Sequence, residues 1–381
     1  MKEFFDKNKS FLLYFFMYCP LGFLCPLIAQ YCDSIGFSGT QVGVVTSCGL
    51  LGAVLGGVFW GRIFANADRK RMVVIIMFLM AGAMALTSLA VKMFVIYALI
   101  YGGLYFFQGP SHGLCDHMIL ANGENFPVIR ALGAIGYACA CYTAGLLSEE
   151  YGLRIIFFLH AGGYVMASLI MATEKEPPHY SDQHNKVSVR ELFKNKRFVK
   201  LIVCSFFVLG TTMANNTYFS YLYIDAGGDV AGVGLAFLLM AGSEAVFMFL
   251  IPKVNKIIPT EKLILVGIGT AVVRYALYST GPSTQVLLGT FFLQGMMNGI
   301  VLVEMVKYFE KIVEPKLASI SVSTYYALGN NFSAIVCSLL GGIVLDATSP
   351  QGVYVFFAAW NIIGMVLYLV LGMHRVCDVE K

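Results

Sequence analysis

Two opposite charges lie where a lipid bilayer should exclude them. Glu244 is midway along the apolar run 231–252, and Arg274 is midway along the apolar run 262–280. A charged side chain at the centre of a bilayer costs at least about 2.5–3.5 kcal/mol on insertion scales, so it normally faces a partner or a watery cavity. A carboxylate and a guanidinium at similar depth in neighbouring runs therefore predict a polar site inside a membrane protein.

This pair of residues is suited to proton chemistry. A buried carboxyl group beside an arginine holds or releases a proton according to whether the arginine engages it. Glu304, on a later apolar run, is placed to share Arg274 with Glu244. The alternative is a static buried ion pair that ties helices together, and the residues alone leave both interpretations open.

The first half of the chain carries a second set of polar residues. Asp116 and Arg130 each lie five or six residues from the turn 122–125, so both have similar depth. They either pair with each other or hold a hydroxyl or carboxylate group of a solute. Isolated histidines in the same half are interpreted as hydrogen-bonded helix residues: His112, His117 and His160.

Amides and hydroxyls are concentrated in two further apolar runs. The run 198–224 contains Asn215 and Asn216, and the run 317–345 contains Asn330 among several serines and tyrosines. Polar side chains in a membrane span usually face a cavity or another helix. They predict a pocket for a small polar solute, and the alternative is hydrogen bonding between helices without solute contact.

The composition is that of a polytopic membrane protein. Of the 381 residues, 58% are hydrophobic and 13% are charged, whereas soluble domains carry about 25% charged residues. A spanning helix needs about 20 mostly apolar residues. We predict twelve such helices, at 11–32, 40–62, 72–91, 93–119, 127–147, 154–173, 198–224, 231–252, 262–280, 284–308, 317–345 and 352–373. The predicted fold class is therefore an all-α polytopic membrane protein.

One polar connection divides these helices into six plus six. It predicts an N-terminal six-helix bundle over 1–173, a linker over 174–197 and a C-terminal six-helix bundle over 198–381. The end of the linker, 187–197, is expected to form a short surface helix.

The basic residues predict the orientation in the membrane. Lys92 and Arg154 lie in loops on one side, and Arg130 and Arg274 lie within spans, so the other side holds 22 of the 26 lysines and arginines. Basic loops remain in the cytoplasm. We therefore expect a multi-pass protein of the cell inner (plasma) membrane with both termini in the cytoplasm.

Several kinds of chemistry lack a signature in this sequence. It contains no phosphate-binding loop, no metal-spaced cluster and no Ser/His/Asp arrangement on one face, and the ten cysteines have no metal-ligand spacing. We expect no enzyme activity, no cofactor, no metal and no nucleic-acid partner. The expected partners are a small-molecule substrate, protons and the lipid bilayer, and the chain is expected to be a monomer.

Topology and one loop resemble the major facilitator superfamily. The loop between the second and third spans of that superfamily reads approximately W-G-R-L-x-D-R-x-G-R-R-R, and residues 60–71 here read WGRIFANADRKR. Ala65 stands where the superfamily usually has an acid, and Asp68 stands where it has its second glycine. That acid normally helps to hold the outward-open state, so its loss puts this interaction in doubt. The resemblance implies two six-helix bundles around a central cavity that opens alternately to either side.

A narrower resemblance points to the branch of lactose permease, nucleoside–proton symporters and phenylpropionate permease. That branch has a glutamate in helix eight and an arginine in helix nine, at the positions of Glu244 and Arg274. Its helix-five run R-x-x-G-x-x-G-aromatic is similar to RALGAIGY, so the resemblance offers Arg130 and Tyr137 as substrate contacts. The branch's helix-four acid is absent, with Asp116 the nearest carboxylate.

The resemblance implies a proton-coupled symporter that imports a small organic solute, with sugars or oligosaccharides preferred. Proton coupling is expected from Glu244, Arg274 and Glu304, and substrate binding from Arg130, Tyr137, Asp116, Asn215, Asn216 and Asn330. The alternatives are an importer of nucleosides or aromatic acids, a proton-driven exporter, or a membrane sensor that transports nothing.

Overall fold

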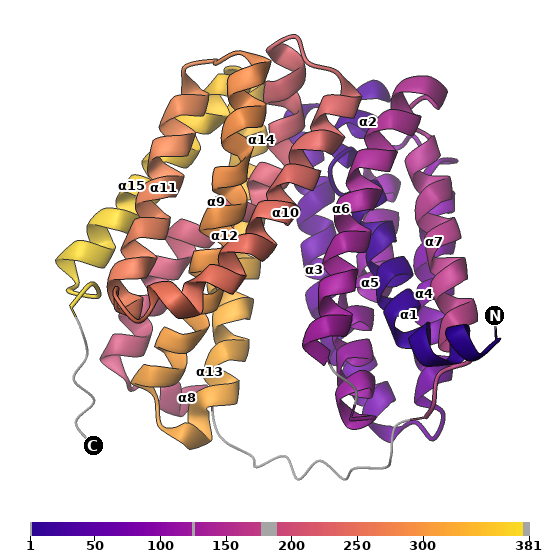
Figure 1. Ribbon diagram of the computed structural model, residues 1–381. Helices are drawn as coiled ribbons and strands as arrows, with labels where there is room; N and C mark the ends of the chain where they lie inside the picture. Colours follow the sequence, from indigo (N-terminus) through magenta and orange to yellow (C-terminus); the bar gives the residue numbers. More distant parts are fainter. Residues whose placement is uncertain (1, 124–125, 177–188, 376–381) are drawn as a thin grey trace. The chain divides into compact units, whose positions relative to one another are not determined.

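The computed structural model describes residues 2–123, 126–176 and 189–375. Within these ranges the secondary structure is helical and contains no β-strand (Figure 1). Two compact units are present, Met1–Ser181 with Gly228–Ala241, and Asp182–Gly227 with Gly242–Lys381. They are called the first unit and the second unit below.

The first unit is a bundle of long helices in which the main packing contacts are between helices that do not follow one another directly in the chain. It comprises α1 (Lys2–Leu24), α2 (Ile28–Ser34), α3 (Gly39–Asn66), α4 (Lys70–Ser88), α5 (Phe94–Ala121), α6 (Phe126–Tyr151) and α7 (Ile155–Met171). α1 and α2 form one span that is interrupted at 25–27, beside Pro26. Proline lacks the N–H group that a continuous helix requires.

The remaining helices belong largely to the second unit. They are α8 (Val189–Leu192), α9 (Lys196–Asp225), α10 (Val230–Val254), α11 (Thr260–Ser279), α12 (Thr284–Ile312), η1 (Pro315–Leu317), α13 (Ala318–Thr324), η2 (Tyr325–Phe332), α14 (Ser333–Ala347) and α15 (Pro350–Val370). η2 is a π-helix, so the eleventh span is α13, η2 and α14 in succession. Such wider turns in a helix frequently occur at functional sites.

The expected twelve membrane helices are confirmed. Ten of the described helical segments are long and apolar enough to span a bilayer, and α7 is a shorter apolar helix. The twelfth, α5, has 28 residues and is less apolar because it carries Gln108, His112 and Asp116 among other polar residues. The expected short surface helix is α8, and most of the predicted linker, 177–188, lies outside the described residues.

Local capping explains where several helices begin. Ser38 and Gln41 form a capping box at the start of α3, in which each side chain bonds the other residue's backbone N–H. The Asn195 side chain accepts hydrogen bonds from the N–H groups of Arg197 and Phe198. α9 therefore starts two residues before the predicted position.

Glycines bring α3 and α5 into backbone contact. A methyl group on Gly52 would clash with the carbonyl of Gly102, and one on Gly56 would clash with the carbonyl of Phe106. Gly57 has open space around it, so it is not part of this contact. The small-x3-small spacing in this helix thus serves close packing inside the first unit.

The beginning of α10 belongs to the first unit, and glycines again allow close contact between helices. A side chain on Gly234 would collide with the backbone of α6 at Cys141, and one on Gly145 would collide with the backbone at Ala231. Two glycines therefore let α6 and this part of α10 approach closely.

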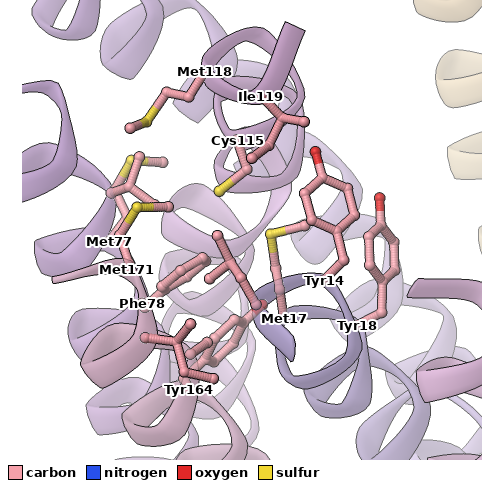
Figure 2. Packing of buried hydrophobic residues seen from close by; sticks show 14 of the residues in the cluster. Tyr14, Met17, Tyr18, Met77, Phe78, Cys115, Met118, Ile119, Tyr164 and Met171 are labelled. Carbon is pink, nitrogen blue, oxygen red and sulfur yellow. The ribbon is translucent and has the colours of Figure 1, made fainter. Parts of the chain in front are cut away.

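The core of the first unit is built from sulfur-containing and aromatic side chains. Met17, Met77, Met118 and Met171 pack with the ring of Phe78 (Figure 2). Unbranched methionine side chains fill irregular spaces between helices. Figure 2 also shows Tyr14 and Tyr18 on the same helix as Met17, at the edge of this core.

Candidate functional site

Two tyrosines of α1 contact Asp116 and Arg130, the charged residues predicted to bind substrate in the first unit. The Tyr14 hydroxyl donates a hydrogen bond of 2.6 Å to Oδ1 of Asp116 on α5. One turn further along, the centroid of the Tyr18 ring lies 4.4 Å from Cζ of Arg130 on α6. The two ring centroids are 6.2 Å apart, and both hydroxyls point the same way (Figure 2). Asp116 and Arg130 therefore belong to one site, joined by two aromatic rings.

The glycines of the RALGAIGY run explain how Tyr18 reaches Arg130. A Cβ atom on Gly133 would lie 2.6 Å from Cδ2 of Tyr18, and one on Gly136 would clash with the carbonyl of Phe15. Because these positions lack side chains, α1 packs directly on α6. Tyr137, on the same helix, is half-buried and packs against the core of the unit.

Two of the three histidines predicted to be hydrogen-bonded, His112 and His160, make such bonds, whereas His117 is exposed and packs edge-on against the ring of Phe64. His112 has Nε2 3.3 Å from the carbonyl oxygen of Met17 and Nδ1 3.2 Å from that of Gln108. Its ring centroid is 4.7 Å from that of Tyr18. Nε2 of His160 lies 2.8 Å from Oε1 of Gln108. His112 thus links the helix of Asp116 to the helix of the two tyrosines.

In the second unit, a row of amides leads to Glu244. Nε2 of Gln294 donates to Oδ1 of Asn298 over 3.3 Å, and Nδ2 of Asn298 donates to Oε2 of Glu244 over 3.2 Å. Gln294 and Asn298 are one turn apart on α12, and Glu244 is half-buried on α10. The sequence analysis did not identify Gln294 or Asn298. The signal available was their spacing of four residues within an apolar run, which places both on one face.

Arg274 is fully buried within an aromatic cage. Its Cζ atom lies 4.6 Å from the ring centroid of Tyr275, 5.2 Å from that of Tyr278 and 5.8 Å from that of Phe291. Within the described residues none of its three guanidinium nitrogens makes a hydrogen bond of regular geometry, although the Tyr278 hydroxyl is near enough to interact with the guanidinium. The hydrogen-bonded ion pair expected between Glu244 and Arg274 is therefore not formed in this structure.

Glu304 has different partners from those expected. Its Oε1 atom accepts from Nζ of Lys307 at 2.6 Å and from Nδ2 of Asn255 at 2.8 Å, and its side chain is fully buried. The structure thus places Glu304 in a lysine ion pair near the end of α10, without a hydrogen bond to Arg274.

The three predicted asparagines of the second unit occupy separate environments. Oδ1 of Asn215 accepts a hydrogen bond of 2.9 Å from Tyr354, whose ring packs 5.3 Å from that of Tyr278 in the Arg274 cage. Asn215 and Arg274 therefore share one polar and aromatic cluster. Asn330 lies in the π-helix η2 and is almost buried, and Asn216 is half-buried. Each of the three has one side-chain atom without a hydrogen-bond partner.

A metal centre is not indicated in the described part of the chain. No group of three or more His, Cys, Asp or Glu residues there has the geometry to hold a metal ion. The charged and amide groups described above are thus suited to binding a proton or a polar solute.

Twelve membrane-length helices with polar sites inside each unit define a polytopic transport protein of the major facilitator type. The sequence model of the MFS_1 like family matches residues 9–356, and the chain belongs to that family. It is a secondary transporter and a multi-pass membrane protein.

The relatives are named for different solutes. The chain is 27% identical to the maltose permease of Geobacillus stearothermophilus over 97% of its own length and 96% of the relative. It is 23% identical to the putative nucleoside transporter YegT of Escherichia coli (strain K12), over 82% of its own length and 78% of the relative. Among solved structures, the nucleoside transporter NupG superposes with a TM-score of 0.87 at 19% identity, covering 97% of this chain and 99% of NupG. This last similarity concerns the fold.

Proposed function

We propose that this transporter is a proton symporter that imports a sugar or oligosaccharide, and that Glu244 carries the proton. The observation that supports this role is the hydrogen bond from the Asn298 amide to Glu244. An amide N–H can donate to a carboxylate and, more weakly, to the carbonyl oxygen of a neutral carboxylic acid. The contact with Asn298 is therefore compatible with both protonation states of Glu244, which a proton-carrying residue occupies in turn.

The buried carboxylates Glu261 and Glu304 of the second unit are held in ion pairs with lysines. Glu261 accepts from Lys311 at 2.8 Å, and Glu304 accepts from Lys307 at 2.6 Å. In this proposal Glu244 carries the proton, and Glu304 contributes its ion pair with Lys307 near the end of α10.

Arg274 completes the proposed cycle. A guanidinium buried without regular hydrogen bonds is costly, because its five N–H groups lose water and gain mainly contacts with aromatic rings. A transport cycle relieves this cost if one of its states supplies an acceptor to Arg274. We propose that the deprotonated Glu244 carboxylate is that acceptor, and that protonation of Glu244 releases Arg274 to its aromatic cage.

The substrate class follows from the first unit and from the relatives. Arg130 offers forked donors, while Tyr18 and Tyr137 offer flat rings, a combination that suits a sugar with paired hydroxyls. The maltose permease relative favours a sugar over the alternatives. Nucleosides are the second candidate, supported by the relative YegT. The protein is placed in the inner (plasma) membrane. Both termini lie in the cytoplasm in this proposal, because basic loops remain on that side.

Proteoliposome transport tests this proposal. Purified protein is reconstituted, and uptake of labelled maltose, maltotriose and uridine is measured with and without an inward proton gradient. We expect accumulation of a maltooligosaccharide only with the gradient, and Glu244→Gln should exchange the solute across the membrane without accumulating it. Accumulation by Glu244→Gln at the wild-type level would remove this residue from the coupling role.

A matched control separates coupling from folding. Glu261→Gln also removes a buried carboxylate of the second unit, but its partner is Lys311. We expect this variant to accumulate solute in proportion to the amount of folded protein. If it loses accumulation while retaining exchange, coupling does not depend on Glu244 specifically. Uptake of uridine instead of sugars would establish the nucleoside alternative.

A further inference from the structure

A pocket of about 330 Å³ lies at one end of the first unit, between the start of α4 and the chain that follows α7. It is lined by Arg69, Arg71, Met72, Ile75, Ala172 and Glu176. Its volume is at the lower end of the range for small-ligand sites, about 300–1,000 Å³. None of these residues has a role in the proposed coupling or substrate binding, although Arg69 and Arg71 belong to the loop 60–71 that resembles the superfamily pattern.

Internal contacts fix one side of this pocket. Nε of Arg71 donates to Oε1 of Glu176 at 2.8 Å, and Nη1 donates to the carbonyl oxygens of Ala172 at 3.0 Å and Glu174 at 2.6 Å. Glu176 also accepts from the backbone N–H of Arg71 at 3.3 Å. The ion pair balances the charge of Arg71, and the site is held in shape before any ligand binds.

Arg69 leaves the pocket with an excess positive charge. Glu176 is the acid of the pocket lining, and it is engaged by Arg71. The neighbouring acid Glu174 is held by Lys9 at 3.5 Å and by the Ser10 hydroxyl at 2.8 Å. The exposed Arg69 guanidinium makes no ion pair or hydrogen bond with the described part of the chain. Its position directly before α4 adds the positive end of the helix dipole.

The opposite side of the pocket continues into an apolar surface. Met72 lines the pocket and is 48% exposed, and it is followed on the same face of α4 by Ile76 at 45% and Leu79 at 46%. These exposed side chains form an apolar stripe along a helix that is long and apolar enough to span a membrane, which suits contact with lipid hydrocarbon. The pocket thus joins a cationic end to an apolar stripe.

We propose that this pocket binds the phosphate headgroup of an acidic phospholipid. The phosphate contacts Arg69 and the unused Nη2 of Arg71, and the acyl chains lie along Met72, Ile76 and Leu79. Arginine presents forked donors that match the oxygens of a phosphate group. A free phosphate compound shares the headgroup chemistry but gains nothing from the apolar stripe, which is why a lipid is the favoured ligand.

Native mass spectrometry and lipid titration in nanodiscs test this assignment. Protein is placed in phosphatidylcholine nanodiscs with increasing phosphatidylglycerol, and the bound lipid and the thermal unfolding midpoint are measured. We expect one retained phosphatidylglycerol and a midpoint that rises with its fraction. Arg69→Gln should weaken binding about fivefold, since one basic residue near an anionic surface contributes about 1 kcal/mol, and Arg69→Glu should weaken it further.

Arg62→Gln is the matched control, because Arg62 is an exposed arginine near the same loop that does not line the pocket. It should retain the lipid like the wild type. If the Arg62 and Arg69 variants lost the bound phosphatidylglycerol to the same extent, or both retained it, the proposed site would be overturned.

Glycerol 3-phosphate distinguishes the two sources of the phosphate group. In a competition experiment at millimolar concentration it should leave the phosphatidylglycerol in place. Full displacement would assign the pocket to a soluble phosphate compound and would overturn the lipid proposal. Leu79→Gln should weaken binding of the lipid while leaving any binding of glycerol 3-phosphate unchanged, because Leu79 belongs to the apolar stripe and does not line the pocket.

Discussion

The Tyr14 hydroxyl and the Asp116 carboxylate form a hydrogen bond of 2.6 Å that joins α1 to α5. Tyr14→Phe removes the donor and leaves a partly buried carboxylate under-satisfied. Hydrogen bonds to charged groups contribute about 1.5–3 kcal/mol, so the thermal unfolding midpoint in detergent should fall measurably.

Two variants make this result specific. The Tyr18 hydroxyl has no hydrogen-bond partner in the described ranges, so Tyr18→Phe should lower the midpoint less than Tyr14→Phe. Asp116→Asn should largely preserve it, because an amide oxygen still accepts from Tyr14. A midpoint unchanged by Tyr14→Phe would show that the bond does not stabilise the protein.

Arg130 is predicted to bind substrate through the geometry of its guanidinium. Arg130→Lys keeps the charge but loses the planar fork and the stacking over Tyr18, so affinity should fall by at least about tenfold. A substrate titration of the purified variant measures this. Near-normal binding would instead indicate that any cation suffices at this position.

Tyr137 lies two turns after Arg130 on α6 and is predicted to offer its flat ring to the substrate. Tyr137→Phe preserves that ring and should retain more binding than Tyr137→Ala, which removes it. The same titration compares the two variants. Equal binding by both would exclude a stacking role for this residue.

Arg274 is predicted to be required for transport and not for stability. Its guanidinium is fully buried without a regular hydrogen bond, and such a charge carries a desolvation penalty of several kcal/mol. Arg274→Met fills similar space without the charge, so its unfolding midpoint should equal or exceed that of the wild type while uptake is lost. Arg274→Ala leaves a cavity and should be less stable than Arg274→Met. An Arg274→Met protein that transports normally would contradict the proposed cycle.

Gly56 and Gly57 are neighbours in α3 with opposite surroundings. A methyl group on Gly56 would clash with the backbone of Phe106, whereas one on Gly57 would meet open space. Gly56→Ala should therefore reduce the yield of folded protein and its unfolding midpoint, and Gly57→Ala should leave both nearly unchanged. Size-exclusion profiles and thermal unfolding of the two variants provide the comparison, and equal behaviour would mean that close packing of α3 on α5 is dispensable.

Hydropathy alone predicted the twelve helices and placed most of their ends within about two residues, whereas α1 begins well before the predicted residue 11 and α3, α6 and α12 continue about one turn beyond their predicted ends. Hydropathy over about 20 residues is a local property that the bilayer thickness fixes, so it needs no knowledge of neighbouring helices. Local capping shifted α9 by two residues, and the π-helix in the eleventh span was not predicted, because a run of apolar and hydroxyl residues reads the same for either kind of turn.

Only the tertiary structure decided which polar groups meet. Similar depth in the membrane suggested that Glu244 would pair with Arg274, yet Glu244 bonds Asn298 and Arg274 lies among aromatic rings. Depth is one coordinate, whereas a contact also requires that two helix faces turn toward each other. That rotation is set by which side chains and glycines pack between the helices, as Gly133 does where it admits Tyr18 beneath Arg130.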